Sequence, residues 1–132
     1  MSARILLQAG VLAALQEAGL AAFDAAPLRR AMPHVVVEEP VLGAMDATGV
    51  VGRVGTIAVS VTDAGAGGGE RPERLRMTLG AVEAAVGAMP RDLPESWRIA
   101  GLRLGKSRIV RGKSEAWIGT SEFQVRLFRI TD

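Results

Sequence analysis

Apolar residues in the first eighteen positions recur with the spacing of an α-helix. The pattern predicts a helix over residues 3–18, which Ser2 is placed to cap and Gly19 to end. Its apolar side chains form two stripes about 110° apart around the helix axis: Ile5, Ala9 and Leu12, and Leu7, Val11 and Leu15. One stripe can cover a sheet, while the other is either buried elsewhere in the monomer or meets a second subunit. We expect Leu7, Val11 and Leu15 to take part in assembly contacts.

A second helical pattern follows Pro72. Pro72 and Glu73 are residues that favour the start of a helix. The apolar residues after them keep a helical period: Leu75, Leu79, Val82, Val86 and Met89. We expect this stripe to pack on a sheet. An adjoining face is smooth enough for another helix to approach closely, and it consists of Ala81, Ala84, Ala85 and Ala88.

The segments between the two helices predict two strands and two flexible connections. Residues 34–38 form a short β-branched run that Pro40 ends. Residues 53–62 alternate larger apolar side chains with small ones, as a strand does. Between these strands we expect residues 43–52 to be a flexible connection holding Asp46. Residues 65–69 contain four glycines in five positions, and we expect them to be mobile in the free protein.

The C-terminal third predicts one long β-hairpin. Residues 97–111 and 117–131 are rich in strand formers and are separated by the five residues 112–116. At about 3.3 Å per residue each arm would reach roughly 50 Å, whereas a compact globule of this length is roughly 36 Å across. Either kinks at Gly101, Gly105 and Gly119 divide the arms into ordinary strands, or the tip of the hairpin overhangs the body.

The order of these elements predicts the fold class. Helix, strand, strand, helix, strand, strand is an α+β arrangement. We expect two helices packed on one face of a four-stranded, mainly antiparallel sheet, with residues 1–132 forming a single domain.

Charge is divided unevenly along the chain. The 132 residues carry 16 basic and 14 acidic side chains, a net charge of +2. Residues 1–95 hold 8 basic and 11 acidic residues, a net of −3, whereas residues 96–132 hold 8 basic and 3 acidic residues, a net of +5. The hairpin is therefore the positive pole and suits an acidic partner surface. Solvated Lys and Arg that keep an exposed strand from aggregating are the plainer explanation.

Composition excludes several classes of site. The chain has no cysteine and a single histidine, His34, so disulfides, thiolate ligands, a cysteine nucleophile and multi-histidine metal sites are all excluded. Gln8 and Gly10 interrupt the apolar N-terminal run, which makes it a poor signal peptide, and no stretch approaches the roughly 20 apolar residues of a membrane helix. We expect a cytoplasmic protein without a membrane segment.

The candidate chemical motifs are weak. Two Gly-Lys-Ser triplets, at 105–107 and 112–114, resemble the end of a phosphate-binding loop, but neither has the upstream glycine or the following helix that the motif requires. His34 and Glu38 would lie about 13 Å apart along a strand, too far for an acid–base pair. Arginines of the hairpin have few interleaved aromatic residues, so sequence-specific nucleic-acid binding is not supported. We expect no catalytic, cofactor or metal site.

Several segments together nevertheless carry a family resemblance. They are residues 33–38; Asp46 with Gly52 and Arg53; Arg71 with residues 74–86; residues 97–103; and residues 107–111 leading to Trp117 and residues 123–126. In this order and spacing the chain resembles the small tail-completion proteins, or tail terminators, of siphophages and of the gene transfer agents of alphaproteobacteria. It departs from them in lacking an aromatic residue late in the second strand, where it reads Ser60, Val61 and Thr62, and in its longer loop at 65–69.

The resemblance implies a non-enzymatic structural protein. Such proteins form a ring, typically of six subunits, that caps the tail tube, stops its growth and joins it to the stopper of the head-tail connector, while DNA passes through the centre without sequence-specific binding. The protein would assemble in the cytoplasm and remain in the tail of the particle. We expect the tip of the hairpin to contact a neighbouring subunit or the tube through Lys106, Arg108, Arg111 and Lys113.

Two other functions remain open at this stage. Another part of the connector, a stopper or an adaptor, would share the absence of chemistry and differ in its neighbours. A small ligand-binding domain, suggested by the glycine-rich loop and the Gly-Lys-Ser triplets, would show a melting temperature that rises with its ligand.

Overall fold

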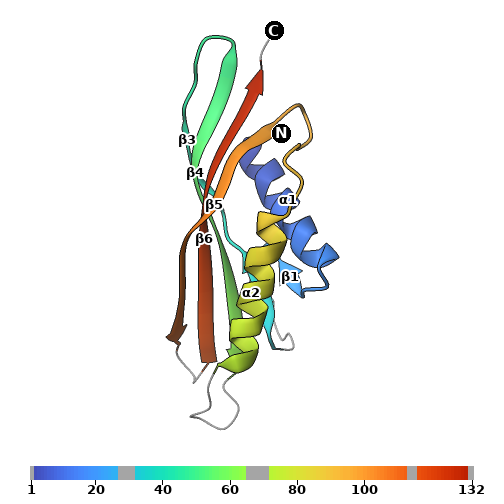
Figure 1. Cartoon of the computed structure of the whole chain (residues 1–132), viewed down its shortest axis with the longest axis vertical. Coiled ribbons are helices and arrows are strands. Elements are labelled where there is room, and N and C mark those ends of the chain that lie inside the picture. The colour runs from blue at the N-terminus through green and yellow to red at the C-terminus, as the bar shows by residue number, and fades with distance from the viewer. Residues whose placement is uncertain (1, 27–31, 65–71, 113–115, 131–132) are drawn as a thin grey trace.

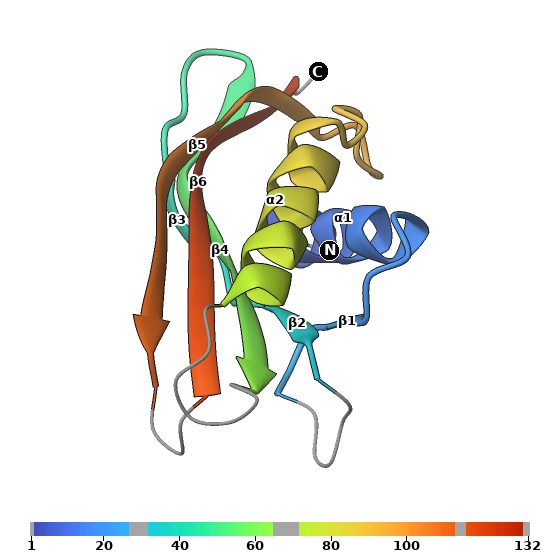
Figure 2. The same ribbon diagram turned by 60° about the horizontal axis from the view of Figure 1, so that its bottom comes forward.

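The computed structural model describes residues 2–26, 32–64, 72–112 and 116–130. Within these residues two helices cover one face of a six-stranded, mostly antiparallel sheet (Figures 1 and 2). The elements follow in the order α1 (Ala3–Glu17), β1 (Ala22–Phe23), β2 (His34–Val37), β3 (Val41–Ala44), β4 (Val50–Ala64), α2 (Glu73–Gly87), β5 (Arg98–Arg111) and β6 (Ala116–Ile130). The α+β class and the two helices on one face are confirmed. The expected loop at 65–69 lies outside the described residues.

The expectation of four strands is wrong, because the described part of the sheet has six. The strand order is β1-β2-β4-β6-β5, with β3 also paired to β4. β1 is only two residues long and pairs with β2 in parallel, while the other pairs are antiparallel. β3 occupies four residues and has mostly exposed side chains, so no alternation marks it in the sequence.

The segment expected to be a flexible connection is instead a hairpin formed by β3 and β4. Asp46 closes it, since its Oδ1 accepts hydrogen bonds from Gly52 N at 2.9 Å and from Arg53 Nη1 at 3.2 Å. The backbone of β3 also lies very close to that of β4. A Cβ on Gly52 would lie 2.2 Å from the Met45 carbonyl oxygen, and one on Gly55 would lie 1.8 Å from that of Val41. Both positions therefore require glycine.

The first helix forms as the sequence predicts, but its faces are used differently. Ser2 Oγ accepts a hydrogen bond from Ile5 N at 3.4 Å, and Gly19 takes a φ of +83° just after the helix. Leu7, Val11 and Leu15 are fully buried against the sheet and α2, whereas Ile5 is 51% exposed. Because Leu7, Val11 and Leu15 belong to the core of the subunit, they are not available to a neighbouring subunit.

The second helix packs through the predicted stripe. Leu75, Leu79, Val82 and Val86 are buried on α2, and Met89 is buried just beyond its end. Two polar contacts add to the apolar packing. Arg74 makes a bidentate pair with the buried carboxylate of Asp63 on β4, with Nε to Oδ2 at 2.8 Å. Glu83 Oε2 accepts hydrogen bonds from the hydroxyls of Ser107 and Ser121, both at 2.6 Å.

The long hairpin forms with nearly continuous arms. β5 and β6 pair from Arg98↔Phe128 to Arg111↔Trp117, with irregularities only between Ile99 and Gly101 and between Leu104 and Lys106. Gly119 of β6, close to the turn of the hairpin, lies under α2 rather than beyond the body, because Leu75 in the first turn of α2 packs over it. The tip expected to overhang includes residues 113–115, which lie outside the described residues. The end that extends past the helices is the opposite one, formed by β3, β4 and the last residues of β6 (Figure 1). The molecule accommodates its long strands by being elongated.

Candidate assembly surfaces

The basic residues predicted at the hairpin lie along an edge of the sheet. Lys106, Arg108 and Arg111 are exposed on β5, which ends the strand order, and Lys113 lies outside the described residues. The guanidinium carbon of Arg111 sits 5.1 Å from the centre of the Trp117 ring. β5 itself contains no acidic residue. The strand therefore presents positive charge along an edge whose backbone has no partner strand in the described part of the chain.

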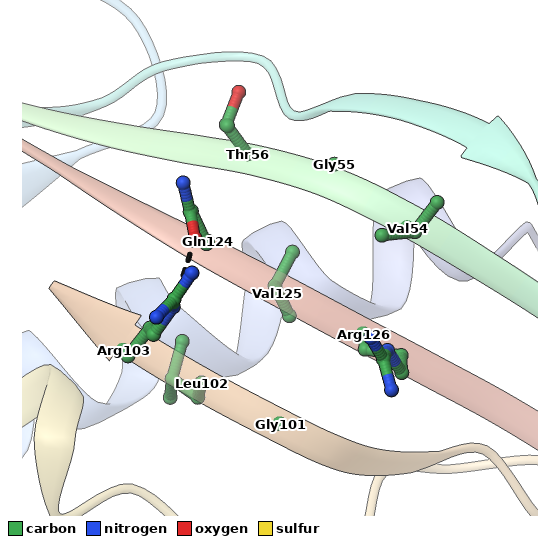
Figure 3. A pocket seen from close by; sticks show the side chains of 9 residues that line it. All are labelled: Val54, Gly55, Thr56, Gly101, Leu102, Arg103, Gln124, Val125 and Arg126. Atoms are coloured by element: carbon green, nitrogen blue, oxygen red, sulfur yellow. Dashed lines mark hydrogen bonds between the residues drawn. The ribbon is translucent and has the colours of Figure 1, made fainter. Parts of the chain in front are cut away.

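The face of the sheet away from the helices is shallowly hollowed. A depression of about 580 Å³ crosses β4, β6 and β5, and residues that line it include Thr56, Arg103, Gln124 and Arg126 (Figure 3). Arg103 Nε donates a hydrogen bond to Gln124 Oε1 at 2.8 Å. The lining holds arginines, an amide and a hydroxyl, but no carboxylate or imidazole that would serve as a base. Its chemistry suits contact with an acidic surface better than a reaction.

The extended end of the molecule combines a charged cluster with a tryptophan. Arg53, which is held by Asp46, and Arg129 lie 5.9 Å and 5.0 Å from the centre of the Trp97 ring. Trp97 is buried, and the segment before β5 carries it to this end. Asp46, Arg53 and Trp97 were recognised in the sequence as separate pieces of the resemblance. Their contact was not predicted, because it depends on the unexpected β3–β4 hairpin.

Apolar side chains are exposed on the same end. Val41 is 70% and Ile130 66% exposed, and Met45 and Val54 are also exposed. In the pairing register Val54 lies beside Gly43 and Arg126, and Val50 lies beside Ile130. Exposed apolar groups that gather at one end of a protein are typical of a contact with another protein.

The remaining sequence candidates do not come together as chemical sites. Gly105, Lys106 and Ser107 lie within an extended strand rather than before a helix, and residues 113–115 are outside the described residues. No group of three His, Asp or Glu side chains among the described residues is arranged to hold a metal ion. No helix in the described ranges is long and apolar enough to cross a membrane.

The contact between Arg74 and Asp63 is structural. The hydrogen bond from Arg74 and the charge of the Asp63 carboxylate raise the pKa of the Arg74 guanidinium, which stays charged at all relevant pH values. The pair joins the end of β4 to the first turn of α2. It therefore fixes the two ends of the segment that contains the glycine-rich loop.

The chain is similar to known proteins in both sequence and fold. Residues 3–127 match the family model described as tail completion protein gp17. A chain in the structure of the virion of a native gene transfer agent particle has the same fold, with a TM-score of 0.79, 22% sequence identity, and coverage of 97% of this chain and 99% of that one. Comparison with curated proteins gives no significant match. The family match covers nearly the whole chain and confirms the resemblance seen in the sequence: the chain belongs to the tail completion protein gp17 family of phage-type tail structural proteins.

Proposed function

We propose that the chain is the tail terminator of a phage or gene transfer agent particle. Six copies form a ring that caps the tail tube, ends its growth and joins it to the stopper of the head-tail connector. DNA passes through the ring without sequence-specific binding. The observation that carries the proposal is the family match over residues 3–127. The whole chain acts as one domain, in which no residue has a catalytic role.

The surfaces of the molecule support a role in assembly. The described residues leave exposed a basic strand edge on β5 and an apolar end at β3 and β4. These are surfaces that proteins bind, since a free strand edge and a grouped set of apolar side chains are both costly to leave uncovered. The fold also matches a chain of a gene transfer agent virion from end to end.

Removing the protein from particles tests the proposal. In a strain that produces the particles, deletion of the gene should give tails of irregular length that lack heads, as seen by electron microscopy. Expression of the wild-type chain from a plasmid should restore tails of uniform length with heads attached. The reason is that nothing else would stop the tube or join it to the connector.

The two alternative functions predict different results. A stopper or an adaptor would leave tails of normal length, with heads that lose their DNA or stay unattached. A ligand-binding domain would leave assembly intact, and its melting temperature would rise with a nucleotide or a related anion. Tails of normal length with attached heads in the deletion strain would contradict the terminator and both connector roles.

A further inference from the structure

The described residues at the two edges of the sheet carry charges of opposite sign. On one side β5 is the last strand, and its exposed basic residues are Arg103, Lys106, Arg108 and Arg111. On the other side of β4 the edge is made of β1, β2 and β3. The exposed carboxylates there are Asp24, after β1, and Glu38 and Glu39, between β2 and β3. Glu17 adds a fourth at the end of α1, where the neighbouring Gln16 donates a hydrogen bond to the Ala22 carbonyl at 3.2 Å. We call these two surfaces the basic edge and the acidic edge.

Most of these charges have no salt-bridge partner among the residues that the structure describes. Lys106 and Arg108 form no salt bridge in the described residues, and neither do the four carboxylates of the acidic edge. Other carboxylates of the molecule are engaged: Asp46 with Arg53, Asp63 with Arg74, and Asp92 with Arg98. Arg4 lies on α1 one helical turn before Gln8, whose Nε2 donates a hydrogen bond to the Val37 carbonyl at 3.1 Å. Residues 29 and 30, both arginine, lie outside the described residues.

The positions of the edges determine which contact they can make. In Figure 2 the end of β5 lies on one side of the molecule, and β1 and the end of α1 lie on the other. Two surfaces on opposite sides of one subunit can join identical copies head to tail, which gives a closed ring when the rotation between copies closes. A two-fold contact of β5 with β5 would instead place Arg108 and its neighbours against like charges, and such juxtaposition is strongly unfavourable.

We infer that the basic edge of one copy binds the acidic edge of the next copy. The inference rests on the proposed ring and names the surfaces that build it: arginines of β5 on one side and carboxylates that follow β1 and β2 on the other. Arginine suits this contact, because its planar guanidinium can hold a carboxylate through two hydrogen bonds.

Charge exchange between the edges tests this contact. The basic-edge variant carries Arg108→Glu and Arg111→Glu, and the acidic-edge variant carries Glu38→Lys and Glu39→Lys. Each variant alone has like charges at the contact, so native mass spectrometry should find monomers. Mixed in equal amounts, the two variants have opposite charges at every contact. The mixture should regain rings that contain equal numbers of the two chains.

A matched control separates this contact from a general effect of charge. Arg76→Glu combined with Gly80→Glu and Gly87→Glu makes the same change in net charge as the basic-edge variant at three exposed positions of α2, away from both edges. This control should assemble as the wild type does, and all variants should keep the wild-type circular dichroism spectrum and melting temperature within a few degrees. Edge variants that assemble normally, a mixture that stays monomeric, or a control that fails to assemble would each overturn the inference.

A disulfide trap tests the contact even if the free ring is unstable. Because the chain has no cysteine, Arg108→Cys combined with Glu38→Cys introduces the only two thiols. Under oxidation the double variant should form head-to-tail ladders on a non-reducing gel, while either single variant stops at dimers. Ladders from the double variant, found together with a wild-type protein that never forms rings, alone or on tail tubes, would contradict the proposed ring but support the contact. Rings of the wild-type protein without ladders from the double variant would support the proposed ring but contradict the contact.

Discussion

Two serine hydroxyls on neighbouring strands donate hydrogen bonds to the same carboxylate oxygen of α2. Ser121 on β6 is fully buried, while Ser107 on the edge strand β5 is exposed, and both lie 2.6 Å from Glu83 Oε2. Because the two donor–acceptor distances are equal, the different burial of the two hydroxyls should set their contributions to stability. They tie the helix to the two strands that form the basic side of the molecule.

Removal of each hydroxyl measures this difference. We expect Ser121→Ala to lower the free energy of unfolding by about 1–3 kcal/mol, since a buried bond to a charged group is lost. Ser107→Ala should cost less, about 0–1 kcal/mol, because water replaces the bond at an exposed site. Equilibrium unfolding in urea gives both values. An equal effect of the two changes would contradict the assigned burial.

Leu7 and Ile5 test which face of the first helix is internal. Leu7 is fully buried and Ile5 is 51% exposed. Leu7→Ala should lower the free energy of unfolding by about 2–5 kcal/mol through the cavity it leaves, whereas Ile5→Ala should change it by less than about 1 kcal/mol. Thermal or urea denaturation of the monomer compares them. A small effect of Leu7→Ala would indicate that Leu7, Val11 and Leu15 contact a neighbouring subunit instead of the core.

At the scale of elements, the β3–β4 hairpin depends on glycines whose missing side chain leaves room for the backbone of the neighbouring strand. Gly55 has the Val41 carbonyl oxygen 1.8 Å from the place of a Cβ, while at Gly43, in the same hairpin, the nearest atom is 3.9 Å away. The pairing of β3 with β4 therefore requires a glycine at position 55 but not at position 43.

Alanine substitutions in the hairpin test this requirement. Gly55→Ala must push β3 away from β4, and we expect it to cost about 1–3 kcal/mol or more in free energy of unfolding. Gly43→Ala should be tolerated. Urea unfolding measures the cost, and amide hydrogen exchange at residues 41–45 should rise in Gly55→Ala alone. Unchanged amide hydrogen exchange in Gly55→Ala would contradict the close approach of β3 to β4 at this position.

The sequence predicted the elements that have a clear period and missed those that do not. Both helices follow from regular apolar spacing, and the long hairpin follows from two stretches of strand formers separated by five residues. The buried stripes of the helices were found except for the assignment of Leu7, Val11 and Leu15. β3 was not predicted, because most of its residues are exposed and its pairing depends on Gly55 in another strand. The acidic edge escaped for a similar reason: Asp24 and Glu38 come together only through strand order.

At the scale of the whole molecule, the uneven charge along the sequence appears in the described residues as two edges of opposite charge. The +5 charge of residues 96–132 appears partly as the basic edge of β5, opposite an edge with exposed carboxylates. Contacts between exposed charges are screened by salt over about 8–10 Å. We therefore expect rising salt concentration to dissociate free rings into monomers, which sedimentation velocity would follow. Rings that grow more stable with salt would indicate an apolar contact instead.

The proposed ring would sit at the end of the tail tube. Electron cryomicroscopy of intact particles, reconstructed around the junction of tail and head, should show one six-fold ring between the tube and the connector. Each subunit should be fitted by this fold, with β5 of one copy facing the β1–β2 edge of the next. The proposed ring would be wrong if the fold repeated along the tube, lay at the far tip of the tail, or were absent from the junction.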